Sequence, residues 1–210
     1  MASRSKVLIL VFVCSAGILG VGAALVWRHS VEAPTLATGD YISPRRAIAD
    51  FSLIDYRGQA FGPHNLRDHW SMLFFGYTNC PEFCPTTLTT LAAMMKRMRA
   101  SGAAVLPQVI FISVDAQRDT PQQLAKYVPY FDPEFIGVTA ADQPTIEAVA
   151  RDFGVAAIIE PKQADGSYTV DHSSTIMVLD PSGKLAAILS GPFTVESLQA
   201  DFQRIVAGPA

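Results

Sequence analysis

Residues 70–85 read WSMLFFGYTNCPEFCP, and this stretch decides the fold that we expect. It opens with Trp70–Tyr77, a short apolar run rich in aromatic residues, which is typical of a buried strand. The proline that ends it favours the first turn of a helix, and over Thr86–Arg99 apolar residues recur on a single helical face. Cys80 and Cys84 therefore lie where a buried strand ends and a helix begins.

The rest of the chain continues this alternation of apolar strand-like runs with helical patterns. Further strands are predicted at Val109–Val114, Phe135–Val138, Tyr168–Val170, Thr175–Leu179 and Lys184–Leu189. Further helices are predicted from Thr120 with Pro121 at its first turn, from Pro144 to Phe153, and from Thr194 to about Val206. Strands that alternate with helices, followed by a hairpin and a closing helix, predict an α/β fold with a mixed sheet covered on both faces.

The composition excludes several classes of protein. Half of the 210 residues are hydrophobic and 17% are charged, a combination that excludes intrinsic disorder. The net charge is −3 and no cluster of Lys and Arg occurs, so we expect no nucleic-acid partner. Three cysteines are too few for a disulfide-stapled scaffold.

The N-terminus carries an unusually apolar segment. Val7–Val26 contains no charged residue, and about 20 helical residues span about 30 Å, the thickness of a bilayer's hydrocarbon core. The basic residues of the leader 1–6 favour a cytoplasmic N-terminus. We therefore expect a single-pass anchor at 7–26 in the inner membrane, a tether at 27–49, and a domain at 50–210 that faces the periplasm.

A cleaved signal peptide is the alternative interpretation of this segment, because small residues at Gly22–Ala24 suit a signal peptidase. The apolar run is longer than the usual core of a signal peptide, which favours a retained anchor. Beyond residue 30 the chain holds 13 basic and 19 acidic residues, since the first 30 hold three basic residues and no acidic one. The exported domain is therefore acidic.

The cysteine pair allows more than one chemistry. The unpaired N–H groups at a helix N-terminus favour a thiolate at Cys84, and two thiols at this spacing can form a redox pair or bind one soft metal ion. A structural disulfide is the plain alternative, although a loop this short gives it little stabilising effect. Zinc is disfavoured because no second cysteine pair or histidine pair completes four ligands.

A histidine can supply a third ligand, but spacing does not choose among the four present. Two thiolates and one imidazole suit Cu(I) and can hold Cu(II). The candidates are His29, His64, His69 and His172. Asp171 can orient the ring of its neighbour or can be a solvated loop carboxylate. Asp115 and Asp119 are candidates for capping and turn residues or for a partner surface, and Met94, Met95 and Met98 for core or a copper-binding patch.

From about residue 50 to residue 206 the sequence resembles the Sco family, also called SenC or PrrC-like. The matching motifs, in chain order, are Phe51-Ser52-Leu53 with Gly58, Phe74-Phe75-Gly76-Tyr77-Thr78-Asn79-Cys80-Pro81-x-x-Cys84-Pro85-Thr86-x-Leu88, Phe111-Ile112-Ser113-Val114-Asp115-x-x-Arg118-Asp119-Thr120-Pro121, Phe135-Ile136-Gly137-x-Thr139, Val170-Asp171-His172-Ser173 and Asp180-Pro181-x-Gly183. Two departures are Ala116, where the family usually has Pro, and residues 154–164, which lack the usual aromatic-rich stretch.

The resemblance implies a thioredoxin-like fold and a membrane-anchored copper chaperone. It implies that Cys80, Cys84 and His172 bind one copper ion, as Cu(I), Cu(II) or both. The implied partners are the cytochrome c oxidase subunit that carries the Cu_A site, other periplasmic copper chaperones, and thioredoxin-like reductants. The alternative functions are a thiol-disulfide reductase of the subunit's cysteines, with Cys80 and Cys84 as the redox dithiol, and a redox-signalling protein.

Overall fold

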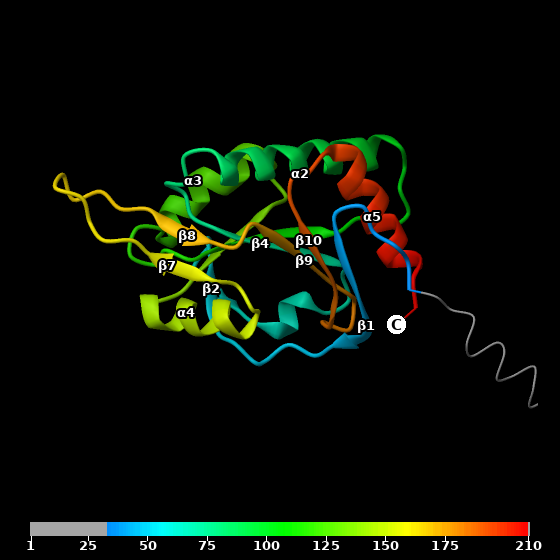
Figure 1. The fold of residues 1–210 in the computed structure, drawn as a ribbon, viewed down its shortest axis with the longest axis horizontal. Helices are drawn as coiled ribbons and strands as arrows, with labels where there is room; N and C mark the ends of the chain where they lie inside the picture. Colours follow the sequence, from blue (N-terminus) through cyan, green and yellow to red (C-terminus); the bar gives the residue numbers. More distant parts are fainter. Residues whose placement is uncertain (1–32, 210) are drawn as a thin grey trace, which may run out of the picture.

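A computed structural model describes residues 33–209 of the chain and places a mixed sheet at its centre (Figure 1). The strand order is β1-β10-β9-β4-β5-β6-β2-β3, and a separate pair is formed by β7 and β8. The strands are β1 (Gly39–Arg46), β2 (Leu53–Asp55), β3 (Ala60–Phe61), β4 (Ser71–Gly76), β5 (Gln108–Ser113), β6 (Ile136–Thr139), β7 (Ala157–Ile159), β8 (Val170–His172), β9 (Thr175–Leu179) and β10 (Leu185–Ser190). The helices are the 3-10 helix η1 (Pro63–Leu66) and the α-helices α2 (Phe83–Ala100), α3 (Pro121–Phe131), α4 (Gln143–Asp152) and α5 (Val195–Ala207).

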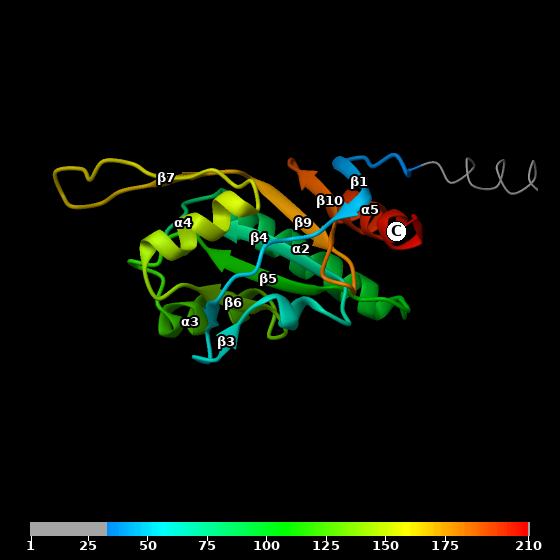
Figure 2. The ribbon, with the colours of Figure 1, turned by 90° about the horizontal axis from the view of Figure 1, so that it is seen from below.

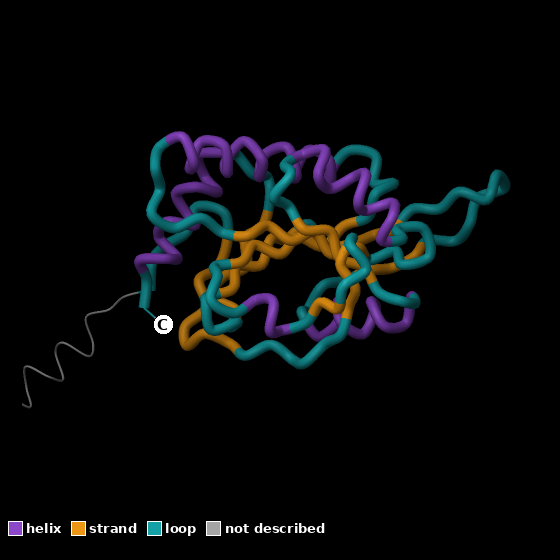
Figure 3. Tube along the Cα trace, turned by 180° about the vertical axis from the view of Figure 1, so that it is seen from behind, coloured by secondary structure: helices purple, strands orange, loops and turns teal. Residues whose placement is uncertain are grey.

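Helices cover both faces of this sheet (Figure 3). The buried apolar residues of α2, α3 and α5 pack with Phe74 and Phe111 on one face. Those of α4 and η1 pack with Phe75 and Ile112 on the other. Neighbouring residues of β4 and of β5 thus point into opposite cores, as a strand buried on both faces requires. The predicted α/β fold with a mixed sheet is confirmed.

The central strands run parallel and end together. β4 pairs with β5 from Ser71 with Gln108 to Gly76 with Ser113, and β6 continues the parallel set beside β5. β9 pairs antiparallel with β4. The carboxyl ends of β4 and β5 therefore lie side by side, so the loops that follow them start from the same edge of the sheet.

Local sequence patterns correctly predicted where most of the helices begin. The side-chain oxygens of Thr120 and Thr194 accept hydrogen bonds from the backbone N–H of Gln123 and Ser197, as N-caps do. The methionines of α2 lie in the core, with Met94, Met95 and Met98 no more than 3% exposed, so the core interpretation of them is the one confirmed.

The strands β2, β3 and β7 were not predicted from the sequence, and two further parts of the chain differ from expectation. Gly39–Arg46, inside the predicted tether, forms the edge strand β1 and pairs with β10. Its burial does not alternate along the strand, so the sequence shows no period of two. The strand predicted at Tyr168–Val170 begins two residues later, at Val170, and pairs with β7 outside the main sheet.

The anchor predicted at 7–26 and its leader lie outside the described residues. Within residues 33–209, no helix combines the length and the hydropathy that crossing a bilayer requires.

A buried carboxylate fastens the start of the domain to α5. Asp201 is fully buried and accepts hydrogen bonds from the backbone N–H groups of Ala37 and Thr38, both at 2.8 Å, and from the Thr38 hydroxyl at 2.7 Å. Ser190, the last residue of β10, donates its backbone N–H to the Thr38 carbonyl. The side chain of Asp201 thus positions the segment that leads into β1.

We expect Asp201→Ala to lower the free energy of unfolding by about 2–4 kcal/mol, because it leaves buried N–H groups without an acceptor. Urea unfolding measures this loss, and amide exchange at Ala37 and Thr38 should accelerate. Glu196→Ala on the same helix is the control. Glu196 is 71% exposed and pairs with Arg97, so its loss should cost less than about 1 kcal/mol. Equal losses in the two variants would contradict the role of Asp201.

Candidate metal centre

The candidate site forms where β4 ends and α2 begins. The chain passes from Gly76 through a loop that carries Cys80, and Glu82 is the N-cap residue of α2. Cys84 lies in the first turn of the helix and is fully buried, whereas Cys80 is partly exposed. A Cβ atom on Gly76 would lie 2.8 Å from the Cys84 sulfur, so this position requires glycine for the sulfur to reach the strand.

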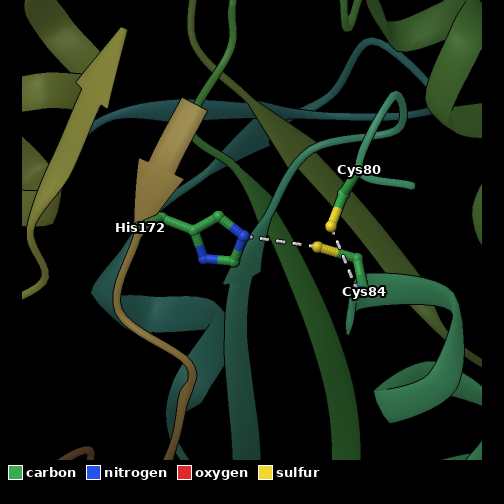
Figure 4. A group of neighbouring side chains, drawn as sticks. All are labelled: Cys80, Cys84 and His172. Atoms are coloured by element: carbon green, nitrogen blue, oxygen red, sulfur yellow. Dashed lines mark hydrogen bonds between the residues drawn. The ribbon is translucent and has the colours of Figure 1, made fainter. Parts of the chain in front are cut away.

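His172 at the end of β8 completes a cluster with the two cysteines (Figure 4). Its Nε2 lies 3.4 Å from the Cys84 Sγ, and the Cys84 N–H donates to the Cys80 Sγ at 3.3 Å. The two sulfurs and one imidazole nitrogen all lie within 4.8 Å of one another. Among residues 33–209 no other group of three or more such side chains has metal-binding geometry. The structure thus brings together the three residues that the resemblance indicated.

The other histidines do not join this cluster. His64 and His69 are exposed and line a polar pocket of about 430 Å³ beside β2 and η1, which also includes Gln108 at the start of β5. The cysteines lie beyond the opposite ends of β4 and β5. His29 falls outside the described residues.

The pKa values of the two thiols are shifted in opposite directions. A hydrogen bond from the Cys84 thiol lowers the pKa of Cys80 to about 4, and His172 and backbone N–H groups also lower it against the opposing effect of partial burial. The same hydrogen bond and nearly complete burial raise the pKa of Cys84. From the sequence, the helix N-terminus is expected to favour a thiolate at Cys84. The hydrogen bond between the thiols and the deeper burial of Cys84 favour the thiolate on Cys80 instead.

The imidazole is oriented by a backbone carbonyl. Nδ1 of His172 lies 3.2 Å from the Ser173 carbonyl oxygen, and a proton donated there leaves the Nε2 lone pair free for a metal ion that binds at the sulfurs. Asp171, a candidate for this task, is exposed, and adjacent residues of a strand point to opposite sides. The acceptor at Nδ1 is therefore Ser173, not Asp171.

Aromatic rings surround His172 on the protein side. The ring centroids of Phe74 and Phe83 lie 6.5 Å from that of the imidazole, and Tyr77 lies edge-on at 5.7 Å. Phe83, which lies between the two cysteines in the sequence, therefore shields the imidazole. These rings limit the directions from which water reaches the nitrogen.

The loop before Cys80 is fixed by a carboxylate that follows β5. Asp119 is fully buried and accepts hydrogen bonds from the Thr78 N–H at 2.8 Å, the Thr78 hydroxyl at 2.6 Å and the Ser113 hydroxyl at 2.7 Å. Burial raises the pKa of Asp119 against these hydrogen bonds. Asp119 was a candidate for a capping or turn residue or for a partner surface, and its hydrogen bonds give it the first kind of role. Its contact with Thr78 spans 41 positions, which no local pattern reveals.

A mixed sheet between helical layers, with two cysteines at a strand-to-helix corner, defines a thioredoxin-like α/β domain that carries a dithiol–imidazole cluster. The sequence matches the SCO1/SenC family over residues 39–207, which is most of the chain. The chain belongs to this family, whose members include copper-binding proteins and cytochrome c oxidase assembly proteins.

Individual relatives agree with this assignment. The SCO2-like protein of Rickettsia felis is 34% identical over 188 residues, which are 88% of this chain and 90% of the relative. The mitochondrial SCO2 homolog of Bos taurus is 35% identical over 158 residues, and the match spans 75% of this chain but 59% of the relative. The copper-bound structure of ScoI from Arabidopsis thaliana is 33% identical, with a TM-score of 0.71 over 76% of this chain and 98% of that chain.

The thiol electrostatics predict selective alkylation. Because the pKa of Cys80 is lowered to about 4, its thiolate predominates at pH 6, and the alkylation rate should fall only as the pH drops through about 4. Cys84 has a raised pKa and is buried, so it should stay unmodified near neutral pH. Brief iodoacetamide treatment followed by fragmentation mass spectrometry assigns the label.

The urea-unfolded chain is the control for this experiment, since both cysteines should then react alike with a rate that rises towards pH 8–9. Faster labelling of Cys84 in the folded chain, or a rate at Cys80 that climbs between pH 7 and pH 9, would contradict the assignment.

Proposed function

We propose that this chain is a copper-binding metallochaperone of cytochrome c oxidase assembly. The observation that carries the proposal is the convergence of Cys80 Sγ, Cys84 Sγ and His172 Nε2 within 4.8 Å. Two soft thiolates and one imidazole are a donor set that Cu(I) prefers and that also holds Cu(II). The copper-bound structures of its relatives and the family's link to oxidase assembly support the same function.

In this function copper is the cargo, one ion per domain. Cys80 offers a sulfur that is already a thiolate and partly exposed, and Cys84 must lose its proton when the metal binds. The exposed side of the cluster leaves room for ligands of an acceptor protein to replace those of the donor one by one. We propose that the acceptor is the oxidase subunit that carries the Cu_A site.

The proposed place of work is the periplasmic surface of the inner membrane. Val7–Val26 is the proposed single-pass anchor, with 1–6 in the cytoplasm, 27–49 as the tether and 50–210 as the copper-binding domain. The structure adds β1 to that domain, since Gly39–Arg46 pairs with β10. The family also includes mitochondrial proteins and a bacterial lipoprotein. Holding donor and acceptor on one membrane raises their effective concentration.

Copper binding should depend on all three side chains. We expect the reduced full chain in detergent to bind one copper ion under anaerobic conditions, and His172→Ala to weaken binding by about tenfold or more. Competition with a chromogenic chelator measures the Cu(I) affinity, and absorption and electron paramagnetic resonance report the Cu(II) ligands. His69→Ala, an exposed histidine outside the cluster, is the matched control and should bind as the wild type does. Equal affinity in His172→Ala and the wild type would refute the three-ligand site.

A second candidate function is reduction of a disulfide in the oxidase subunit. It is favoured by the asymmetry of the thiols, because a partly exposed thiolate at Cys80 suits attack and a buried thiol at Cys84 suits resolution. Cys80 would attack one sulfur of the target disulfide and release the other as a thiolate. Cys84 would then attack Cys80 and release the second target thiol. The Cys80–Cys84 disulfide that results needs a thioredoxin-like reductant to return it to the dithiol.

This second function predicts a trapped intermediate. Cys84→Ser should accumulate a mixed disulfide between Cys80 and a peptide that carries the oxidised cysteine pair of a Cu_A subunit, because the resolving thiol is gone. Intact-mass spectrometry detects the adduct, and Cys80→Ser is the control that should give none. Failure of Cys84→Ser to form the adduct would exclude the reductase function. Rapid peptide reduction by a wild-type chain that binds copper only weakly would make reduction the main role.

A further inference from the structure

The imidazole of the copper site stands on a hairpin that the main sheet does not hold. β7 and β8 pair only with each other in the described part of the chain, through three residues on each strand. The loop between them projects beyond the body of the domain (Figures 1 and 2). Cys80 and Cys84, in contrast, belong to the loop and helix that follow β4. His172 is held on one side by β9, which begins three residues later and pairs with β4, so on its other side its position depends on what fastens the hairpin.

A polar contact at Tyr168 fastens it to the turn after β5. Tyr168, two residues before β8, is 8% exposed, and its hydroxyl donates to Asp115 at 2.8 Å. Arg118 Nη1 donates to the Tyr168 carbonyl at 3.0 Å, and its guanidinium lies 3.6 Å from the centroid of the Tyr168 ring. We call this set, Asp115, Arg118 and Tyr168, the hairpin latch.

Burial and charge pairing stabilise the geometry of the hairpin latch. Asp115 is fully buried, and Arg118 Nε donates to its carboxylate, so the buried charge is paired. This ion pair is costly to separate, because loss of Arg118, whose side chain is 22% exposed, would leave the Asp115 carboxylate buried and uncompensated. The planar guanidinium contacts the carboxylate, the carbonyl and the ring together, which a lysine ammonium cannot do.

The ring of Tyr77 connects the hairpin latch with the imidazole of His172. The Arg118 guanidinium lies 5.6 Å from the Tyr77 centroid, and Tyr77 lies edge-on to His172 at 5.7 Å. Val170 lies between Tyr168 and His172 on the hairpin. It is buried in the apolar core that also contains Tyr77. The chain is thus held at Tyr168 by the hairpin latch and at His172 by the contact with the Tyr77 ring.

We infer that the latch positions His172 over the two sulfurs, so that Asp115, Arg118 and Tyr168 set how much the imidazole contributes to copper binding. Its effect on copper rests on the proposed function, whereas its hold on the hairpin does not. The residues act through His172 and are positioning residues, because none of them supplies an atom to the cluster.

The first test uses the copper-free, reduced full chain. Tyr168→Phe removes one hydroxyl and keeps the ring under Arg118, so the variant should fold. We expect amide exchange over Ala157–His172 to accelerate about tenfold, with β4 and β5 unchanged, and the imidazole resonances of His172 to shift. Tyr41→Phe is the matched control, since the Tyr41 hydroxyl donates to the Pro209 carbonyl far from the hairpin. Unchanged exchange of the hairpin in Tyr168→Phe would overturn the inference.

The second test is a double-mutant cycle on Cu(I) affinity. Tyr168→Phe should weaken binding about tenfold in the wild-type background, a typical effect of losing a group that orients a ligand, and less than twofold in the His172→Ala background. A purely structural role would give equal losses in both backgrounds, and that result would overturn the inference. Arg118→Lys loses the combined contacts of the guanidinium, so it should weaken binding at least as much as Tyr168→Phe does.

Failure of the proposed function looks different in these experiments. If His172→Ala binds copper as tightly as the wild type does, the three-ligand site is rejected. The exchange measurement on the copper-free chain then still decides whether the latch holds the hairpin.

Discussion

The parallel pairing of β4 with β5 is the constraint on which the site depends. The pairing aligns Gly76 with Ser113, so the loop that carries Cys80 and the turn that carries Asp115 and Asp119 leave the sheet at one edge. At that edge the backbone of β4 is approached closely from the helix side. A Cβ atom on Gly76 would meet both the Cys84 sulfur and the ring of Phe111 at 2.8 Å. Any larger residue there would displace either a ligand or a core aromatic ring.

Three fully buried carboxylates fix the segments that the sheet does not hold. Asp119 binds the loop before Cys80, Asp115 binds the hairpin that carries His172, and Asp201 binds the segment that enters β1. Each accepts hydrogen bonds from the segment that it positions, and a buried acceptor that lost them would be left unsatisfied. Irregular segments therefore acquire the definite geometry that a ligand set requires, in addition to the apolar contacts that residues such as Tyr168 and Val170 make.

What the sequence could predict was what short-range patterns encode. The strands β4, β5 and β9 are apolar runs, and Thr120 and Thr194 cap their helices through bonds to residues three positions away, so both were visible in the sequence. The strand β1 was not visible, because edge pairing and Asp201, rather than an alternating pattern, make it a strand.

The residues of the candidate site also fall into those that a local motif predicts and those that it does not. The cysteine pair and its strand-to-helix corner follow from a local motif. His172 lies 88 positions from Cys84, and only the resemblance to a family chose it among four histidines. Arg118 and Tyr168 are 50 positions apart, and neither is a residue type that spacing singles out. In the proposed function, copper binding and disulfide formation use the same two sulfurs, so a Cys80–Cys84 disulfide would leave His172 as the cluster's single ligand. A domain of this design binds copper only while its dithiol is reduced. In an oxidising compartment, its copper-binding state is therefore set by a reductant as much as by the metal supply.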